Sequence, residues 1–356
     1  MLLKELLKEI IDNRGKNPPE YVAYGIPVID NYLIDNNFHP NLTRVNRYIS
    51  TDTYNNFIRK KTIENDLLIT LVGNGYGNIT LSPKNTIIIQ NTIGLRTNEK
   101  ICLSKYLYYL LLNQKTTIRN LNRGCAQPSI KVSDLLSIDL NIHSLPEQKH
   151  IVDTIGSIDD LIEKYEKIVN KLLKNAKLFY LKNISNNVVP LGDLINIFDN
   201  IRKPLSSNER KGNKIYPYYG ATQIIDYVDE YLFDGEYILL AEDGTVINDD
   251  ETPVIQFITG KNWVGNHAHV LNSKGILNLY SLYFILQQTN VKEAITGAVQ
   301  LKINQENLKK IIVNLPNNID EYNNYSKSLM TIILKYKNKL SKLYTLKKHF
   351  LDKYFR

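Results

Sequence analysis

The chain has 356 residues, 43% of them hydrophobic and 22% charged, a balance typical of a soluble chain with room for two domains and connecting helices. No apolar run reaches the roughly 20 residues of a membrane span, and the start MLLKELLKEIIDNRG carries charges inside its hydrophobic pattern, unlike a signal peptide. The expected location is therefore the cytoplasm. A net charge of +8 permits a nucleic-acid partner without establishing one.

The first half of the chain alternates short apolar runs with polar loops. Apolar spacing makes residues 2–11 and 104–114 candidate helices. Short β-branched runs bounded by Gly, Asn, Asp or Pro predict strands at 28–30, 67–72 and 86–90. Residues 1–145 are therefore predicted to form a mixed, strand-rich domain.

A long helix is predicted next, over residues 146–188. Ser144 supplies an N-cap, Pro146 an early proline and Glu147 the acid three residues after the cap. Apolar residues then recur at spacings of four and three, which is typical of the seam of a coiled coil. The seam positions assigned here are Ile155, Ile158, Ile162, Tyr165, Val169 and Leu172.

The second half contains the same kinds of element in the same order. Strands are predicted at 237–241 and 253–258, and a helix at 279–287, within a second domain over 189–317. A second long helix is predicted over 318–356. Its seam residues are Leu329, Ile333, Tyr336, Leu340 and Leu343, and Lys347 interrupts the apolar spacing.

An internal repeat links the two halves. The block Gly124-Cys-Ala-Gln127-Pro-Ser-Ile130 recurs 173 positions later as Gly297-Ala-Val-Gln300-Leu-Lys-Ile303, and the apolar rhythm after each block also recurs. A nearly constant offset over about 60 residues indicates a duplication. Two related helices can bury their seams by packing against each other. The predicted fold is therefore α+β, with two strand-rich domains in pseudo-twofold repeat, separated by two long helices that form an antiparallel coiled coil.

Several segments of the two halves and their junctions form recognisable patterns: Asn13-Arg-Gly-Lys-Asn-Pro-Pro, Tyr24-Gly-Ile-Pro, Gln90-Asn-Thr-Ile-Gly-Leu-Arg96, Gln127-Pro128, Leu145-Pro146-Glu147-Gln148, Lys214-Ile-Tyr-Pro-Tyr-Tyr-Gly-Ala-Thr and Gly260-Lys-Asn-Trp-Val-Gly-Asn-His-Ala-His-Val270. By these segments the chain resembles the specificity subunits of type I restriction-modification systems, and the resemblance covers nearly the whole chain. The second junction departs from the family pattern, because Leu301 stands where the first junction has Pro128.

The resemblance implies a division of labour among subunits. Each globular half would be a target-recognition domain that reads one half of a split site on double-stranded DNA, and the helix pair would set the gap between the halves. Two methylation subunits and the restriction subunits would be the partners. Those partners would bind S-adenosylmethionine, ATP and Mg, so no cofactor and no catalytic residue are expected in this chain.

Polar and aromatic side chains in loops beside the strands are the candidate DNA contacts, because they suit base edges, stacking or phosphates. The same residue types also suit plain turns, and that alternative stays open at each position. In the first half the candidates are Asn74, Tyr76, Asn78, Gln90, Asn91, Arg123 and Gln127. In the second half they are Tyr219, Thr222, Gln223, Lys261, Asn262, Trp263, Asn266, His267, Gln300 and Lys302.

Other functions find weaker support in the sequence. Asn17-Pro18-Pro19 is similar to part of an amino-methyltransferase motif, but Glu20 stands where an aromatic residue should stack a flipped base. His267 and His269 share a strand face without a third metal ligand nearby in sequence, so no metal site is expected. A coiled-coil adaptor whose lateral domains bind other proteins remains an alternative.

Overall fold

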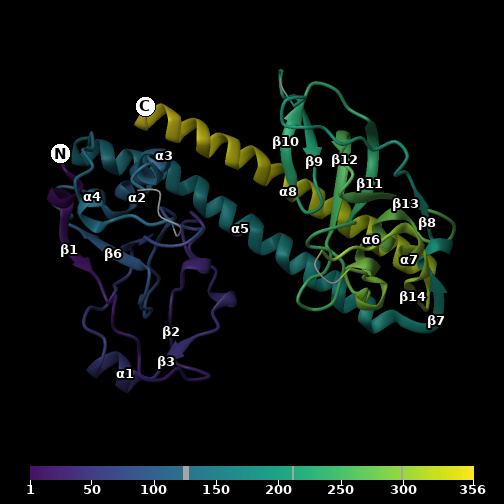
Figure 1. Cartoon of the computed structure of the whole chain (residues 1–356), viewed down its shortest axis with the longest axis horizontal. Helices are drawn as coiled ribbons and strands as arrows, with labels where there is room; N and C mark the ends of the chain where they lie inside the picture. Colours follow the sequence, from purple (N-terminus) through teal and green to yellow (C-terminus); the bar gives the residue numbers. More distant parts are fainter. Residues whose placement is uncertain (123–127, 211, 298–299) are drawn as a thin grey trace. The chain divides into compact units, whose positions relative to one another are not determined.

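The computed structural model describes residues 1–122, 128–210, 212–297 and 300–356 (Figure 1). Internal contacts divide the chain into a first unit, Met1–Lys164 with Leu340–Arg356, and a second unit, Tyr165–Lys339. Each unit holds one strand-rich domain and a part of both long helices. Among the helices of these ranges, none is both long and apolar enough to cross a membrane.

The first unit is built on a four-stranded antiparallel sheet in the order β1-β6-β4-β5. Helix α2 packs on this sheet and buries Tyr106, Tyr108 and Tyr109 in the core. The strands of this sheet are β1 (Leu7–Ile11), β4 (Leu67–Thr70), β5 (Ile79–Leu81) and β6 (Thr92–Thr97). Strands β2 (Ile26–Pro27) and β3 (Tyr48–Ile49) of the first unit pair separately with each other. Its short helices are α1 (Thr51–Asn56), α2 (Ser104–Asn113), α3 (Lys115–Arg119) and α4 (Val132–Leu136).

The second unit is built on a six-stranded sheet in the order β10-β9-β12-β11-β13-β8, and α6 packs on β11 and β13. Only the pairing of β9 with β12 is parallel among the ladders of the described strands. The strands are β8 (Ile195–Ile197), β9 (Tyr216–Tyr219), β10 (Ile224–Val228), β11 (Phe233–Ala241), β12 (Ile255–Val264) and β13 (Ala268–Ser273), and β7 (Ile184–Pro190) pairs with β14 (Ile312–Pro316). The helices are α6 (Leu279–Leu286) and α7 (Gln305–Lys310).

The duplication is visible in the strand pairing. In the first unit Leu67 of β4 lies between Leu95 of β6 and Leu81 of β5. In the second unit Ile238 of β11 lies between Leu271 of β13 and Phe257 of β12. The order β1-β6-β4-β5 thus recurs as β8-β13-β11-β12, and the second unit extends it with the β9-β10 hairpin.

The two long helices are α5 (Leu145–Asn183) and α8 (Ile319–Phe355), and they run antiparallel where they meet. In the second unit the Tyr165 ring lies 5.2 Å from that of Tyr336, and further along α5 the Phe179 ring lies 3.8 Å from Tyr325, nearer the start of α8. At about 1.5 Å per residue, 39 residues give α5 a length of about 58 Å. Helix α5 ends at Asn183, before the predicted end at 188, because the residues from Ile184 onward form strand β7 and pair with β14.

The predicted seam positions face inward. Those buried to more than nine-tenths are Ile155, Ile158, Ile162, Val169, Leu329 and Ile333, and those partly buried are Tyr165, Leu172, Tyr336, Leu340 and Leu343. Lys347, the interruption in the second seam, is only 13% exposed and pairs with Asp159 of α5 at 2.7 Å. A charged residue therefore fits the seam because a buried carboxylate meets it there.

The helix predicted over residues 2–11 is wrong. Leu3–Leu6 form a 3-10 turn, and Leu7–Ile11 form strand β1, which pairs with β6. Leu3, Leu6 and Ile11 are fully buried. Burial and strand pairing therefore override the helical spacing of a charged, leucine-rich segment. The strands predicted at 28–30 and 86–90 are also not part of a ladder: they are extended segments joined by one parallel bridge between Val28 and Ile87.

Candidate nucleic-acid interface

Three backbone hydrogen bonds gather the polar loops at one end of the first sheet. Beyond the end of β4, Leu71 N–H donates to Asn91 (2.7 Å), and the Leu71 carbonyl accepts from Ile130 N–H (2.9 Å). Gly73 N–H donates to the Pro128 carbonyl at 3.0 Å. We call these three bonds the junction frame, because they join the loop after β4, the segment before β6 and the segment that leads toward the long helix α5.

The second unit contains the same junction frame. Glu242 N–H donates to His267, and the Glu242 carbonyl accepts from Ile303 N–H, both at 2.9 Å. Gly244 N–H donates to Leu301 at 3.0 Å. Leu301 can replace Pro128 in this frame, because the residue contributes only its backbone carbonyl, as the hydrogen-bond acceptor. Gly297 has a φ of +90°, and an added Cβ would clash with the Gln300 carbonyl, which explains a glycine at the start of the block.

The first-half candidates differ in how freely they can contact a ligand. Asn74, Gln90 and Asn91 are exposed, and the Gln90 amide donates to Asn17. Tyr76 is partly buried beneath the Arg119 guanidinium, 5.5 Å from its ring centroid. Arg123 and Gln127 lie outside the described residues.

Asn78 has a structural use. Its amide nitrogen donates to the Ile34 carbonyl at 3.0 Å, and its oxygen accepts from Asn36 at 2.9 Å. These bonds tie the loop after β4 to the segment that follows β2. We therefore correct the prediction for Asn78: its polar atoms are engaged inside the domain.

In the second half, the turn that connects β9 to β10 presents two of the candidates. Gly220 N–H donates to the Gln223 carbonyl at 2.9 Å, which closes the turn and leaves the side chains of Thr222 and Gln223 exposed. Tyr219, just before it, packs against the core, and burial raises the pKa of its hydroxyl. Lys261 is exposed, with its ammonium 4.5 Å from the Tyr231 ring centroid.

Two predicted contacts, Asn262 and Trp263, are buried and therefore misplaced. Asn262 is 1% exposed, and its amide donates to the carbonyls of Thr259 and Gly260. Trp263 is 7% exposed, and its indole N–H donates to Lys203 at 2.7 Å. Both side chains are buried and bonded within the domain, so neither is available to a DNA groove.

The remaining candidates lie around the second junction frame. Asn266, His267 and Gln300 are exposed, and His267 Nδ1 lies 2.8 Å from Asp243. Lys302 is half exposed and pairs with Glu242 at 3.1 Å. The structure thus brings Asn266, His267, Gln300 and Lys302 together at one end of the sheet, and their contact with DNA stays a prediction.

A buried ionic cluster beneath this frame was missed by the sequence analysis. Arg202 donates to the backbone carbonyls of Asn266 (3.2 Å) and Ala268 (2.7 Å), and its guanidinium lies 2.5 Å from Glu242 and 3.4 Å from Asp199. Arg202 therefore fixes the loop that carries Asn266 and His267. The usable signal was an aspartate and an arginine three residues apart directly after a strand.

The carboxylates of this cluster are held in their charged form. Burial alone would raise the pKa of Asp199, but the hydrogen bond from His269 and the charge of Arg202 lower it below its usual value. Burial likewise opposes ionisation of Glu242, yet its bonds to Arg202 and Lys302 lower its pKa. The cluster therefore stays ionised near neutral pH, and its attraction holds strands β8, β11 and β13 together at this end.

Asp199, Glu242 and His269 offer donor atoms within 4.8 Å of one another, a grouping that could hold a metal ion. His269 Nδ1 lies 2.6 Å from Asp199 and Nε2 lies 2.8 Å from the Ile303 carbonyl, so both ring nitrogens already have hydrogen-bond partners within the domain. Because Arg202 also pairs with both carboxylates, we assign this cluster a structural role.

Comparison with known proteins gives consistent matches. The model of the type I restriction modification DNA specificity domain matches residues 5–174 and 183–340. A Haemophilus influenzae protein named as a type I restriction enzyme specificity subunit is 37% identical over 147 residues, which cover 40% of this chain and 37% of that protein. A type I specificity subunit of Mycoplasma genitalium is 28% identical over 190 residues, covering 48% and 47%.

This chain therefore matches less than half the length of these two curated relatives. A crystal structure of the S subunit of a type I restriction-modification system from M. genitalium covers 100% of this chain and 95% of that chain, with a TM-score of 0.60 and 18% identity. At that identity the likeness shows the fold.

Proposed function

Because the chain belongs to the family of type I restriction modification DNA specificity domains, we propose that it reads DNA sequence for a type I restriction-modification complex. Each strand-rich domain reads one half of a split site on double-stranded DNA. The paired helices set the number of unread base pairs between the halves. The chain itself carries out neither methylation nor cleavage.

The observation that carries this proposal is the repeated junction frame with different side chains on it. The first frame presents Gln90 and Asn91, and the second presents Asn266 and His267. Amide and imidazole groups can each pair with base edges, and a different set of donors and acceptors selects a different base sequence. One backbone arrangement bearing two side-chain sets is what two independent half-site readers need.

The partners follow from the same proposal. Two methylation subunits would dock on the pseudo-twofold helices and bring S-adenosylmethionine, and restriction subunits would bring ATP and Mg. The exposed face of both long helices is available for such docking in each unit, because the apolar seam is buried within the helix pair. The chain's own contribution would be binding and placement.

The test is retention of host DNA fragments by the full chain together with its cognate methylation subunits. We expect retention of a small set of fragments that share one split motif, with an affinity that falls steeply as salt rises. A coiled-coil adaptor would retain no fragment selectively. Retention that ignores sequence and salt would contradict the proposal.

A further inference from the structure

A short basic segment lies between α1 and β4 in the first unit, Phe57-Ile-Arg-Lys-Lys61. Arg59 is exposed, and no hydrogen bond or ion pair engages its guanidinium within the described ranges. The Lys61 ammonium lies 4.7 Å from the Tyr54 ring centroid, and that of Lys16 lies 5.2 Å from the Phe57 ring centroid. The segment therefore presents positive charge with supporting aromatic rings.

Buried side chains hold this segment in place. Asn13, 2% exposed, donates to the carbonyls of Lys60 (2.8 Å) and Ile88 (3.0 Å), and its oxygen accepts from Lys60 N–H at 3.1 Å. Ile88 lies two residues before Gln90, the candidate base reader. One asparagine thus fixes the basic segment against the chain that carries Gln90.

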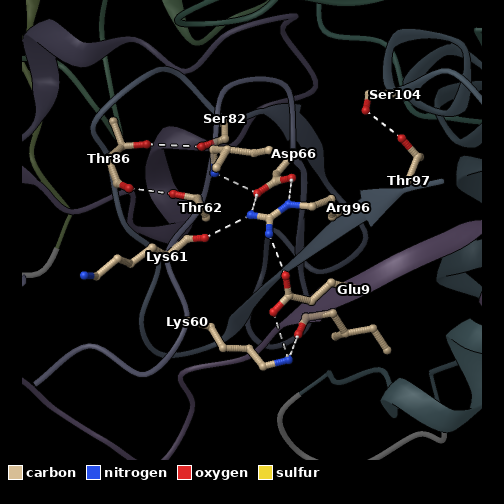
Figure 2. A network of polar contacts seen from close by, with 12 residues as sticks. Glu9, Lys60, Lys61, Thr62, Asp66, Ser82, Thr86, Arg96, Thr97 and Ser104 are labelled. Carbon is tan, nitrogen blue, oxygen red and sulfur yellow. Dashed lines mark hydrogen bonds and ion pairs between the residues drawn. The ribbon is translucent and has the colours of Figure 1, made fainter. Parts of the chain in front are cut away.

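Arg96 holds the other side of the segment, as Figure 2 shows. Its guanidinium donates to both oxygens of Asp66 at 3.0 and 2.8 Å, to Glu9 at 2.5 Å and to the Lys61 carbonyl at 3.0 Å. Lys60 also pairs with Glu9, at 3.4 Å. The acids of this network are therefore used by Arg96 and Lys60, which leaves Arg59 and Lys61 as the surplus positive charge.

The fold itself does not require a basic segment here. Leu67 of β4 and Ile238 of β11 hold matching places in the two sheets, each between its two ladder partners. Counting back six to ten residues from these two places, the counterpart of Phe57–Lys61 in sequence is Val228-Asp-Glu-Tyr-Leu232. The second copy thus carries two acids in the corresponding segment, so the repeat does not itself require basic residues here.

We propose that Arg59, Lys61 and Lys16 form a phosphate-contacting surface that docks the backbone of duplex DNA beside the bases read near Gln90. Lysine and arginine neutralise phosphates, and such contacts set the register of a domain on the duplex. The link to Gln90 is direct, because its amide donates to Asn17, the neighbour of Lys16. This inference rests on the proposed DNA-reading function and adds a surface to it.

The test compares the full chain, with its methylation subunits, against Arg59→Ala/Lys61→Ala on DNA that carries the recognised motif and on randomised DNA. Each lost phosphate contact lowers the slope of log affinity against log salt by about 0.9. Between 50 and 200 mM salt the wild type should therefore lose about 12-fold more affinity than the double variant. Base preference at every position should stay unchanged.

Lys84→Ala is the matched control, because Lys84 is an exposed lysine of the same unit, with a side chain 73% exposed, paired with Glu64. It should leave the slope as in the wild type. Arg59→Lys should keep most of the slope, since the charge remains. An unchanged slope in a folded double variant, shown by an unchanged melting temperature, would overturn the inference. If the wild type itself binds no motif, the proposed function fails instead.

Discussion

Replacing Asp159 by leucine should lower the free energy of unfolding by about 3–5 kcal/mol, because it leaves the Lys347 ammonium buried without its counter-charge. Lys347 is 13% exposed and Asp159 7%, and their atoms lie 2.7 Å apart. Asp159 also accepts a hydrogen bond from the Tyr109 hydroxyl at 2.7 Å. The pair therefore links the two long helices to the core of the first unit.

The double variant Asp159→Leu/Lys347→Leu separates charge from packing. Two apolar residues restore an uninterrupted seam, and replacing a buried ion pair by apolar side chains is often neutral or stabilising. We therefore expect the double variant to recover most of the stability lost by the single variant. Chemical denaturation followed by circular dichroism measures both. A double variant as unstable as Asp159→Leu would show that the ion pair is not the cause.

A surface pair serves as the control for this experiment. Glu306 and Lys310 lie 2.8 Å apart on α7 with side chains 79% and 68% exposed. Exposed pairs contribute about 0–1 kcal/mol because water screens them. Glu306→Ala should therefore change stability far less than Asp159→Leu.

Lengthening both long helices by one heptad should lengthen the unread part of the DNA site. Seven residues added after Asn170 in α5 and seven after Met330 in α8 keep the seam in phase, because the heptad is its repeat. The added rise is about 10 Å, or roughly three base-pair steps of 3.4 Å. Sequencing of the methylated motif should show the same half-sites with a longer gap.

The control is the same insertion in α5 alone, which leaves its partner helix seven residues short. That variant should lose stability and methylation together, because part of the seam is left without a partner. If the matched insertion changes a half-site and leaves the gap unaltered, the helices do not act as the spacer.

The helices and the repeat were predictable from sequence because their signals are long. The predicted helices 104–114 and 279–287 agree with α2 and α6 to within a residue, and the seam spacing located α5 and α8. Ile130 and Ile303, which are 173 residues apart, donate the equivalent hydrogen bond in the two junction frames, so the offset found in the sequence corresponds to a structural match. A signal spread over many positions survives local exceptions.

Short elements were less predictable, because burial and pairing decide them. Residues 2–11 have helical spacing, yet they form a turn and strand β1. A similar 3-10 turn, Leu191–Asp193, precedes β8 at the edge of the second sheet. Asn262 and Trp263 looked like groove contacts because they lie in a polar stretch, but both side chains are buried in the domain.

Exchange of residues 189–317 for the matching domain of a relative, followed by sequencing of the methylated motif in cells that also hold the methylation subunits, tests the central claim most directly. If each domain reads its own half-site, one half of the motif should change to that of the donor, while the other half and the gap stay as they were. A motif in which both halves change, or neither does, would contradict independent reading by the two domains.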